Sequence, residues 1–301
     1  MNKMLFLELA IFIMMSVGFL SRKFQVLGSD AEKVITDLVI QIVLPCNILN
    51  SFLSGAHGID ASGFLTVLLV SFGIQLVSTL YAKYAFPKQS DARRCNLGYA
   101  MICSNAGFLG NPITEGAFGA PGLMLTSIYL IPQRIMMWSE GLAIYSGETD
   151  KKAAIRKIIT HPCVIACLLG VFLMVTGIPF PDFLRTPLQS IGACNTPLTM
   201  MMIGMILSRV DLRHLADKTI LWFTLHRLVL MPLLVYVVCR LLGISTLVTG
   251  VSVLLAAMPA GATTTMLAAK YNRDPEFATR LVVFTTLCSI PAIFLWILVL
   301  T

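Results

Sequence analysis

Two apolar stretches of the sequence carry helix-breaking and polar residues inside runs that are otherwise hydrophobic. The first reads Ser-Asn-Ala-Gly-Phe-Leu-Gly-Asn-Pro over residues 104–112, and the second reads Met-Pro-Ala-Gly-Ala-Thr-Thr-Thr over residues 258–265. Proline removes a backbone donor and clashes with the preceding turn, and glycine resists helix, so a continuous helix is not expected in either stretch. The half-helix N-termini that such breaks create expose N–H groups and favour anions, carboxylates especially.

The residues of these two stretches are the candidate substrate-binding residues. Their amides and hydroxyls can donate hydrogen bonds to a carboxylate, and their prolines and glycine set the position of each break. Two proline kinks packed against neighbouring helices would explain the same pattern, but paired breaks at equivalent positions favour a binding site. The candidates are Asn105, Asn111, Pro112, Pro259, Gly261, Thr263, Thr264 and Thr265.

Two arginines lie in the middle of apolar segments, where each costs a few kcal/mol unless it has a partner. Arg134, beside Gln133, either binds a substrate carboxylate through a bidentate fork or forms a permanent ion pair with Glu140 or Glu115. Arg227 is a candidate for coupling or gating, although a structural role or snorkelling toward the interface is the favoured interpretation.

Asp37 and Gln41 form a third candidate set, for coupling or gating. They lie one helical turn apart in the apolar segment 34–53 and therefore share a face. Asp37 could carry protons, whereas an ion pair with a nearby basic residue is the more common situation for such an aspartate.

The sequence has no pattern typical of an enzyme. Its four histidines are scattered, its eight cysteines include no Cys-x-x-Cys pair, and neither a nucleophile elbow nor a phosphate loop is present. We therefore expect no catalytic activity, no metal and no cofactor.

The elements that must position these residues are membrane-spanning helices. Hydrophobic residues make up 57% of the chain and charged residues only 12%, far from the usage of soluble domains. Apolar runs of about twenty residues, long enough to cross a ~30 Å hydrocarbon core, recur along the whole chain. We expect an all-α polytopic protein with ten transmembrane helices, at residues 4–20, 34–53, 64–81, 95–118, 123–145, 158–176, 188–207, 219–242, 246–269 and 277–300.

The distribution of lysine and arginine sets the predicted orientation. Alternate connections hold nearly all of these residues, and the opposite set holds only Lys3, Arg185 and Arg240. By the positive-inside rule, both termini should lie outside the cytoplasm. Topology therefore explains the net charge of +7, and nucleic acid is not expected as a partner.

The chain divides into two halves of five predicted spans, and an odd number of spans inverts the second half. The predicted organisation is a first repeat at 1–147, a cytoplasmic linker at 148–157 and a second, inverted repeat at 158–301. Asn105 to Gly107 matches Pro259 to Gly261, and Leu44-Pro45 matches Thr196-Pro197 at a nearly equal offset. Agreement in order and offset favours an inverted repeat.

With these motifs in this order, the chain resembles the auxin efflux carrier family, which includes bacterial malate- and malonate-type permeases and the plant PIN auxin carriers. The resemblance covers essentially the full length, and no single motif is specific. The motifs that carry it are Leu44-Pro45, residues 105–112 followed by Gly119, Trp138 to Gly141, Arg227 with Met231-Pro232, and Met258 to Gly261 followed by Ala269 to Tyr271 and Asp274.

The resemblance implies a bile-acid-transporter-like fold in which helices four and nine are broken and cross. It also implies a scaffold of helices 1, 2, 6 and 7, a transport unit of helices 3, 4, 5, 8, 9 and 10, an elevator mechanism and a homodimer. Asn105 keeps the seven-residue spacing to Pro112 of the family asparagine that holds the substrate carboxylate. The family has a second proline where Thr264 stands here, and the long cytoplasmic loop of the plant carriers is absent.

We therefore expect a secondary carrier of small organic anions, such as mono- or dicarboxylates or auxin-like acids, in the inner membrane of a bacterium. Proton or sodium coupling is open. The alternatives are a sodium-coupled bile-acid-type symporter and a sensor of the same ligands that does not transport them. Residues 258–266 contain no acidic or amide side chain, which argues against sodium coordination by that helix.

Overall fold

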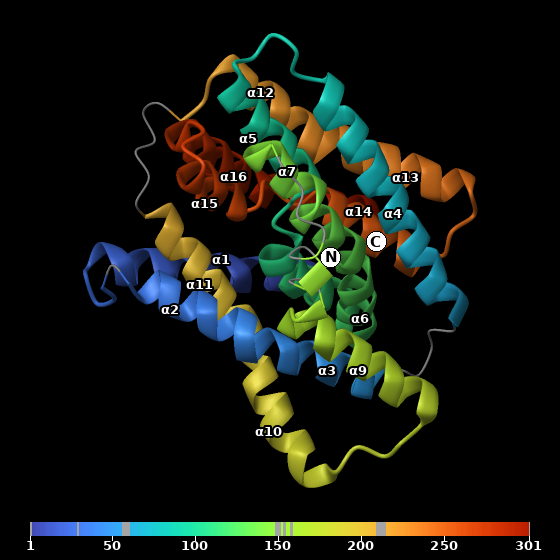
Figure 1. The fold of residues 1–301 in the computed structure, drawn as a ribbon. Coiled ribbons are helices and arrows are strands. Elements are labelled where there is room, and N and C mark those ends of the chain that lie inside the picture. The colour runs from blue at the N-terminus through green and yellow to red at the C-terminus, as the bar shows by residue number, and fades with distance from the viewer. Residues whose placement is uncertain are drawn as a thin grey trace. The chain divides into compact units, whose positions relative to one another are not determined.

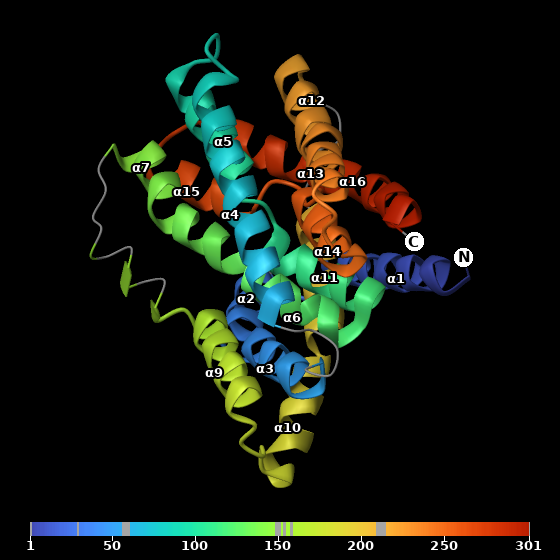
Figure 2. The same cartoon turned by 90° about the vertical axis from the view of Figure 1, so that its right-hand side faces the viewer.

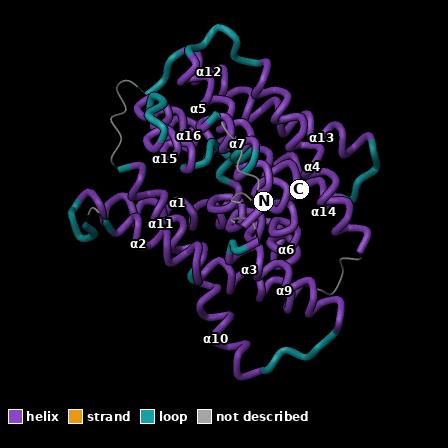
Figure 3. Tube along the Cα trace, in the orientation of Figure 1, coloured by secondary structure: helices purple, strands orange, loops and turns teal. Residues whose placement is uncertain are grey.

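The computed structural model describes residues 2–28, 30–55, 61–147, 152, 155–156, 159–208 and 215–300. All regular secondary structure in these ranges is helical, with loops between the helices. β-type pairing is limited to one isolated antiparallel bridge between Ser104 and Ala260 (Figure 3). The predicted all-α class is therefore confirmed. The predicted linker at 148–157 lies largely outside the described residues.

Several helices are long and apolar enough to cross a membrane. Four such segments occur among the described residues, and two shorter apolar helices accompany them at Pro162–Thr176 and Thr246–Ala256. All six coincide with predicted spans, so the chain has the helices of a polytopic membrane protein. The count of ten and the inverted repeat stay predictions. The four long segments are Lys33–Ser54, Ser62–Tyr84, Lys218–Leu241 and Pro275–Leu300.

The chain forms two compact units. Unit 1 comprises Met1–Ile59, Pro112–Ser127 and Thr160–Asp211, and unit 2 comprises Asp60–Asn111, Ile128–Ile159 and Leu212–Thr301. Unit 1 contains α1 (Asn2–Lys23), α2 (Ala31–Leu38), the π-helical turn η1 (Val39–Val43), α3 (Leu44–Gly55), α9 (Pro162–Thr176), α10 (Asp182–Ala193) and α11 (Asn195–Leu207).

Within unit 1, α1 lies along α11 and α3 lies along α9 (Figures 1 and 2). Gly18 and Gly204 allow the first pair to touch through their backbones. A Cβ added to Gly18 would lie 1.9 Å from the Met201 carbonyl oxygen, and one added to Gly204 would lie 1.9 Å from that of Met15. Any larger residue would force these two helices apart.

Unit 2 is built around α14 and α5. The first packs against α4, α13 and α16, and the second against α4, α7, α15 and α16. The helices of the unit are α4 (Ala61–Tyr84), α5 (Asp91–Ile102), the π-helical turn η2 (Ala106–Gly110), α7 (Glu140–Ser146), α12 (Lys218–Leu225), the π-helical turn η4 (His226–Leu230), α13 (Met231–Leu241), α14 (Thr246–Ala256), α15 (Thr263–Lys270) and α16 (Pro275–Leu300).

The helix α6 (Asn111–Trp138) contributes to both units. Gly119 interrupts it with φ 68° and ψ −159°, a conformation that only glycine adopts readily. This interruption falls between the predicted fourth and fifth spans, so α6 joins the second half of one predicted span to most of the next.

Each described π-helical turn comes directly before a residue–proline pair. η1 precedes Leu44-Pro45, η2 precedes Asn111-Pro112 and η4 precedes Met231-Pro232. Proline has no N–H to donate, and its ring clashes with the carbonyl four residues earlier, so the preceding turn widens to relieve the contact. The three prolines therefore account for the local irregularity of their helices.

Candidate functional site

The first predicted break lies between α5 and α6. α5 ends at Ile102, Cys103 is extended (φ −112°, ψ 92°), and the chain re-enters helix through η2 after Asn105. Pro112 follows η2 directly, and the widened turn of η2 relieves the contact between the proline ring and the preceding carbonyl. The first turn of η2 leaves the N–H groups of residues 106–108 without intrahelical acceptors, as at any helix start.

The second break lies between α14 and α15. α14 ends at Ala256, α15 begins at Thr263, and Pro259, Ala260 and Gly261 lie in the non-helical connection. The Thr264 and Thr265 N–H groups donate short-range bonds to the Gly261 and Ala262 carbonyls, at 3.0 and 3.1 Å. The non-helical connections are thus residues 103–105 and 257–262, and the remainder of each predicted stretch begins the helix that follows.

The two breaks pair with each other inside unit 2. The Asn105 N–H donates to the Pro259 carbonyl at 2.8 Å, and the Gly261 N–H donates to the Cys103 carbonyl at 3.0 Å. Ser104 and Ala260 form the antiparallel bridge between them. A Cβ on Gly261 would lie 2.9 Å from the Cys103 oxygen, so the close approach requires glycine. The structure thus brings together the two sequence stretches that contain the candidate residues.

Arg227 binds the helix ends that stop at this crossing. Its Nε donates to the Met258 carbonyl at 2.9 Å and its Nη1 donates to the Met101 carbonyl at 2.8 Å. These carbonyls lie at the C-terminal ends of α14 and α5, where helix dipoles place negative partial charge. Arg227 is 4% exposed. Its two bonds support a structural role, and a part in coupling or gating stays a prediction.

Side chains from three further helices hold the crossing in place. Gln133 of α6 donates through Nε2 to the Ser104 carbonyl at 2.8 Å, and Ser104 Oγ donates to Gln133 Oε1 at 3.3 Å. The Ala260 N–H donates to Thr285 Oγ1 of α16 at 3.2 Å. On the α15 side, Tyr99 donates to Thr263 Oγ1 at 3.1 Å, and Tyr145 of α7 donates to the Thr264 carbonyl at 3.3 Å.

The sequence interpretation missed most of these supporting residues. Gln133 carried a signal, because an amide beside a mid-membrane arginine is unusual. Tyr99, Tyr145 and Thr285 carried none, since a tyrosine or threonine in an apolar helix more often satisfies its hydroxyl locally or at the interface. Tyr145 also donates to Asn96 Oδ1 at 2.7 Å, which links α7 to α5.

Arg134 differs from Arg227 in having no hydrogen bond or ion pair among the described residues. It is 7% exposed, and its Nη1 is fully buried without an acceptor. Neither Glu140 nor Glu115 forms the alternative ion pair in this structure; Glu115 accepts from Asn47 Nδ2 at 3.0 Å within unit 1. A buried guanidinium without acceptors is costly, and an anionic partner would offset that cost for Arg134.

The remaining candidates differ in how available they are. The Asn105 side chain is 9% exposed and makes no side-chain hydrogen bond within the described ranges. Asn111 is fully buried and donates from Nδ2 to the Gly107 carbonyl, so its amide supports the break in this conformation. Thr264 is also fully buried, with an Oγ1 that lacks a partner, whereas Thr265 Oγ1 donates to the Ala262 carbonyl at 2.7 Å.

Asp37 and Gln41 belong to unit 1. Asp37 is on α2 and Gln41 in η1, and both are exposed. The ion pair that was the favoured interpretation for Asp37 is not formed with any described residue. In the described part of the chain, no three His, Cys, Asp or Glu side chains gather as they would around a metal ion.

Comparison with known proteins finds several transporters similar to this chain over nearly its whole length. An "Uncharacterized transporter" of Methanothermobacter thermautotrophicus is 27% identical over 301 residues, 97% of each chain. The uncharacterized transporter MJ1031 of Methanocaldococcus jannaschii is 25% identical over 96% of each chain, and the uncharacterized transporter YfdV of Escherichia coli K12 is 23% identical over 97% of this chain and 96% of its own.

The match to the family extends from the first predicted span to the last. The membrane transport protein family, which is that of the auxin efflux carriers, matches residues 7–297. This range includes both breaks, Arg134 and Arg227. The chain therefore belongs to the membrane transport protein family.

Proposed function

We propose that the protein is a secondary carrier of small organic anions, such as mono- or dicarboxylates, which bind where the two broken helices cross. The observation that carries the proposal is Arg134, a buried guanidinium without an acceptor in the same unit as the crossing. A carboxylate can accept two parallel hydrogen bonds from a guanidinium, and such charge-assisted pairs are the strong ones. Substrate binding would satisfy an arginine that the protein itself leaves unsatisfied.

The crossing offers further donors suited to a carboxylate. The Asn105 side chain has no partner of its own among the described residues, and it stands at the N-terminal end of η2, where N–H groups are free. α15 begins with three threonines. Two half-helix N-termini beside one another favour negative charge. These features support Asn105 and Thr263 to Thr265 as the substrate-binding set.

The division into two units supports an elevator movement of one unit against the other. Unit 1 contains nearly all of the predicted spans 1, 2, 6 and 7, and unit 2 contains predicted spans 3, 8, 9 and 10 with the first part of span 4 and most of span 5. Residues 112–127, which the proposal assigns to the moving part, cluster with unit 1 instead. We infer that residues near this division act as the hinge during alternating access.

The proposal includes a setting and a mode of energisation. We place the protein in the plasma membrane of a bacterium, with both termini outside the cytoplasm and with a homodimer as the working form. A proton or sodium gradient would drive uptake, without a cofactor and without catalysis. Uptake into proteoliposomes under imposed gradients of each ion separates the two, and sodium dependence would favour the bile-acid-type symporter.

The test is uptake of labelled mono- and dicarboxylates by proteoliposomes that contain the full chain. We expect saturable uptake in the wild type. Loss of one charge-assisted hydrogen bond costs about 1.5–3 kcal/mol, so Asn105→Ala should weaken apparent affinity by roughly tenfold or more. Arg134→Gln should reduce uptake at least as much. Arg240→Gln, a change of an exposed arginine on α13, is the matched control and should leave uptake intact.

Stability separates a binding role of Arg134 from a structural one. Because its guanidinium is buried without an acceptor, Arg134→Gln should leave the unliganded protein at least as stable as the wild type. A destabilised variant would indicate a structural partner and would contradict the proposed role. Carboxylate binding without uptake in the wild type would instead support the sensor alternative.

A further inference from the structure

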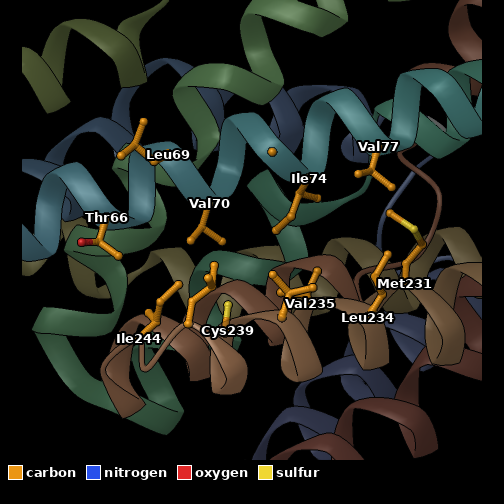
Figure 4. A pocket seen from close by; sticks show the side chains of 13 residues that line it. Thr66, Leu69, Val70, Ile74, Val77, Met231, Leu234, Val235, Cys239 and Ile244 are labelled. Atoms are coloured by element: carbon orange, nitrogen blue, oxygen red, sulfur yellow. The ribbon is translucent and has the colours of Figure 1, made fainter.

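An apolar groove runs between α4 and α13 in unit 2 (Figure 4). Val70, Ile74 and Val77 of α4 face Met231, Val235 and Cys239 of α13 across a cavity of about 500 Å³. Both helices pack on α14. Both belong to long apolar segments, so the groove opens where hydrocarbon would surround the protein.

Gly73 keeps this groove open. It lies in the wall formed by α4, and a Cβ added to it would meet no atom within 4 Å. Gly73 is therefore not required for close packing of helices, unlike Gly18 or Gly204. Glycine inside a helix is unfavourable by about 1 kcal/mol relative to alanine, so a glycine with open space beside it leaves room for something outside the chain.

A basic pocket lies beyond the end of α4, against α12, which continues through η4 into α13. Lys88 and Gln89, in the loop after α4, face Lys218, Thr219 and Trp222 of α12 around a cavity of about 390 Å³. Gln89 Nε2 donates to Thr219 Oγ1 at 3.0 Å, which fixes the loop against α12.

The acidic residues closest in sequence to the two lysines are paired with other groups; Asp91, three residues after Lys88, lies 3.2 Å from Arg94. Asp217 precedes Lys218, but it accepts from the Thr219 and Ile220 N–H groups at 2.9 Å and lies 3.6 Å from Arg93 and 3.8 Å from Arg280. Its charge is therefore shared with two arginines. Lys88 and Lys218 leave the pocket with a positive character that suits a phosphate.

Aromatic side chains connect the basic pocket to the groove. Tyr81 of α4 lies 5.3 Å from His226, and His226 lies 4.3 Å from Trp222, measured between ring centroids. Tyr81 is one turn beyond Val77, and His226 is one widened turn before Met231, so the aromatic rings stand at the end of the groove. Tyrosine and tryptophan are typical of the membrane interface, where a lipid passes from its polar to its apolar part.

We propose that this seam binds one anionic phospholipid, with its phosphate at Lys88 and Lys218 and an acyl chain in the groove. The length of the groove along α4 agrees with the length of an acyl chain. Tyr84 and Gly73 are eleven residues apart, about 16 Å at 1.5 Å per residue, and one leaflet of a ~30 Å hydrocarbon core is ~15 Å thick. A chain that starts at the basic pocket therefore reaches Gly73. A helix about 10 Å wide over the same length would need roughly 1,200 Å³, which is more than the groove holds.

The test is thermal unfolding of the full chain in neutral detergent with added lipid, because a ligand of the folded state raises its unfolding temperature. Phosphatidylglycerol should raise it more than phosphatidylcholine, and glycerol phosphate, which has no acyl chain, should have no effect. Native mass spectrometry should show one phosphatidylglycerol retained per chain. Equal effects of the two lipids would mean general solvation and would overturn the proposal.

Two variants test the two parts of the site independently. Gly73→Leu fills the groove, and Lys88→Gln with Lys218→Gln removes the charge; each should abolish the preference for phosphatidylglycerol and the retained lipid. Leu298→Phe, on an exposed position of α16, and Lys270→Gln are the controls and should keep both. Retention of the preference in both test variants would refute the site. A change of oligomeric mass in Gly73→Leu would identify a second copy as the occupant and would also refute it.

Discussion

Arg227 provides the sharpest test of how the crossing is held together. Its guanidinium donates to one carbonyl at the end of α5 and to one at the end of α14, at 2.8 and 2.9 Å. Arg227→Met keeps an unbranched side chain of similar reach but removes both donors. Met101 and Met258 would then have carbonyl oxygens without a donor, in the part of unit 2 where both half-helices end.

The expected loss follows from these two bonds. A buried polar group left without its partner costs about 1–3 kcal/mol, so two carbonyls give about 2–6 kcal/mol. Removing the guanidinium recovers little free energy. Its insertion into the membrane costs about 2.5–3.5 kcal/mol, but its two hydrogen bonds, at about 1.5–3 kcal/mol each, already offset that cost. We take about 3 kcal/mol as the expected decrease in unfolding free energy. Arg227→Lys, which can keep one bond, should lose about half as much.

The assay has a global and a local measurement. Unfolding in mixed micelles with an increasing fraction of dodecyl sulfate gives the change in unfolding free energy, and Arg240→Met is the control, expected within about 0.5 kcal/mol of wild type. The local measurement is the labelling rate of Cys103, which is buried at the crossing, in a background without the other cysteines. An opening free energy lower by 3 kcal/mol raises this rate by roughly 100-fold. Wild-type stability and labelling in Arg227→Met would refute this account of the crossing.

Two further changes test the contact between the breaks. Gly261→Ala places a Cβ 2.9 Å from the Cys103 carbonyl oxygen and should cost about 1–3 kcal/mol in the same unfolding titration, whereas Gly28→Ala, in open space, should not. Thr285→Val removes the acceptor of the Ala260 N–H and should cost about 1 kcal/mol, while Thr279→Val, on an exposed position of the same helix, serves as its control. A Gly261→Ala variant with unchanged stability would show that the breaks do not depend on this close approach.

The positions of the two breaks could be predicted from the sequence because their causes are local. Pro112 and Pro259 each remove a donor, and the adjacent glycines weaken the helix, so the effect is encoded within a few residues of where it occurs. The same reasoning explains why π-helical turns precede Pro45, Pro112 and Pro232. A proline in an apolar segment thus predicts a local departure from regular helix, even where the hydrophobicity of the whole segment predicts one helix.

The partners across the crossing could not be predicted, because they depend on how distant helices pack. Gln133 bonds to Ser104, 29 residues away, and Thr285 bonds to Ala260 from another helix. Periodicity assigns a side chain to a face of its helix but does not say which helix that face meets. For Asn111 the sequence predicted a ligand donor, which stays a prediction, and the bond of its amide to the Gly107 carbonyl was not foreseen.

The sequence favoured a structural role for Arg227 and left two roles open for Arg134, and the structure gives the two arginines different surroundings. Arg227 has two acceptors, and Arg134 has none among the described residues. The difference arises from the helices that surround each arginine, so no pattern near either residue contains it. The hydrogen-bond acceptors around each arginine in the folded chain distinguish the two, and they support the proposed anionic partner of Arg134.

The charges at the crossing support the proposed binding of an anion there. The C-termini of α5 and α14 meet the N-termini of η2 and α15 at the crossing. Each C-terminus is equivalent to about half a negative elementary charge and each N-terminus to about half a positive one, so the four partial charges nearly cancel. Arg227 adds a full positive charge on the C-terminal side, where its bonds to Met101 and Met258 fix it. The N-terminal ends are then left uncompensated, and the crossing as a whole is positive. Since a positive centre within a membrane is costly, the proposed carboxylate would gain both from the N–H groups at the start of η2 and from the positive charge of Arg227.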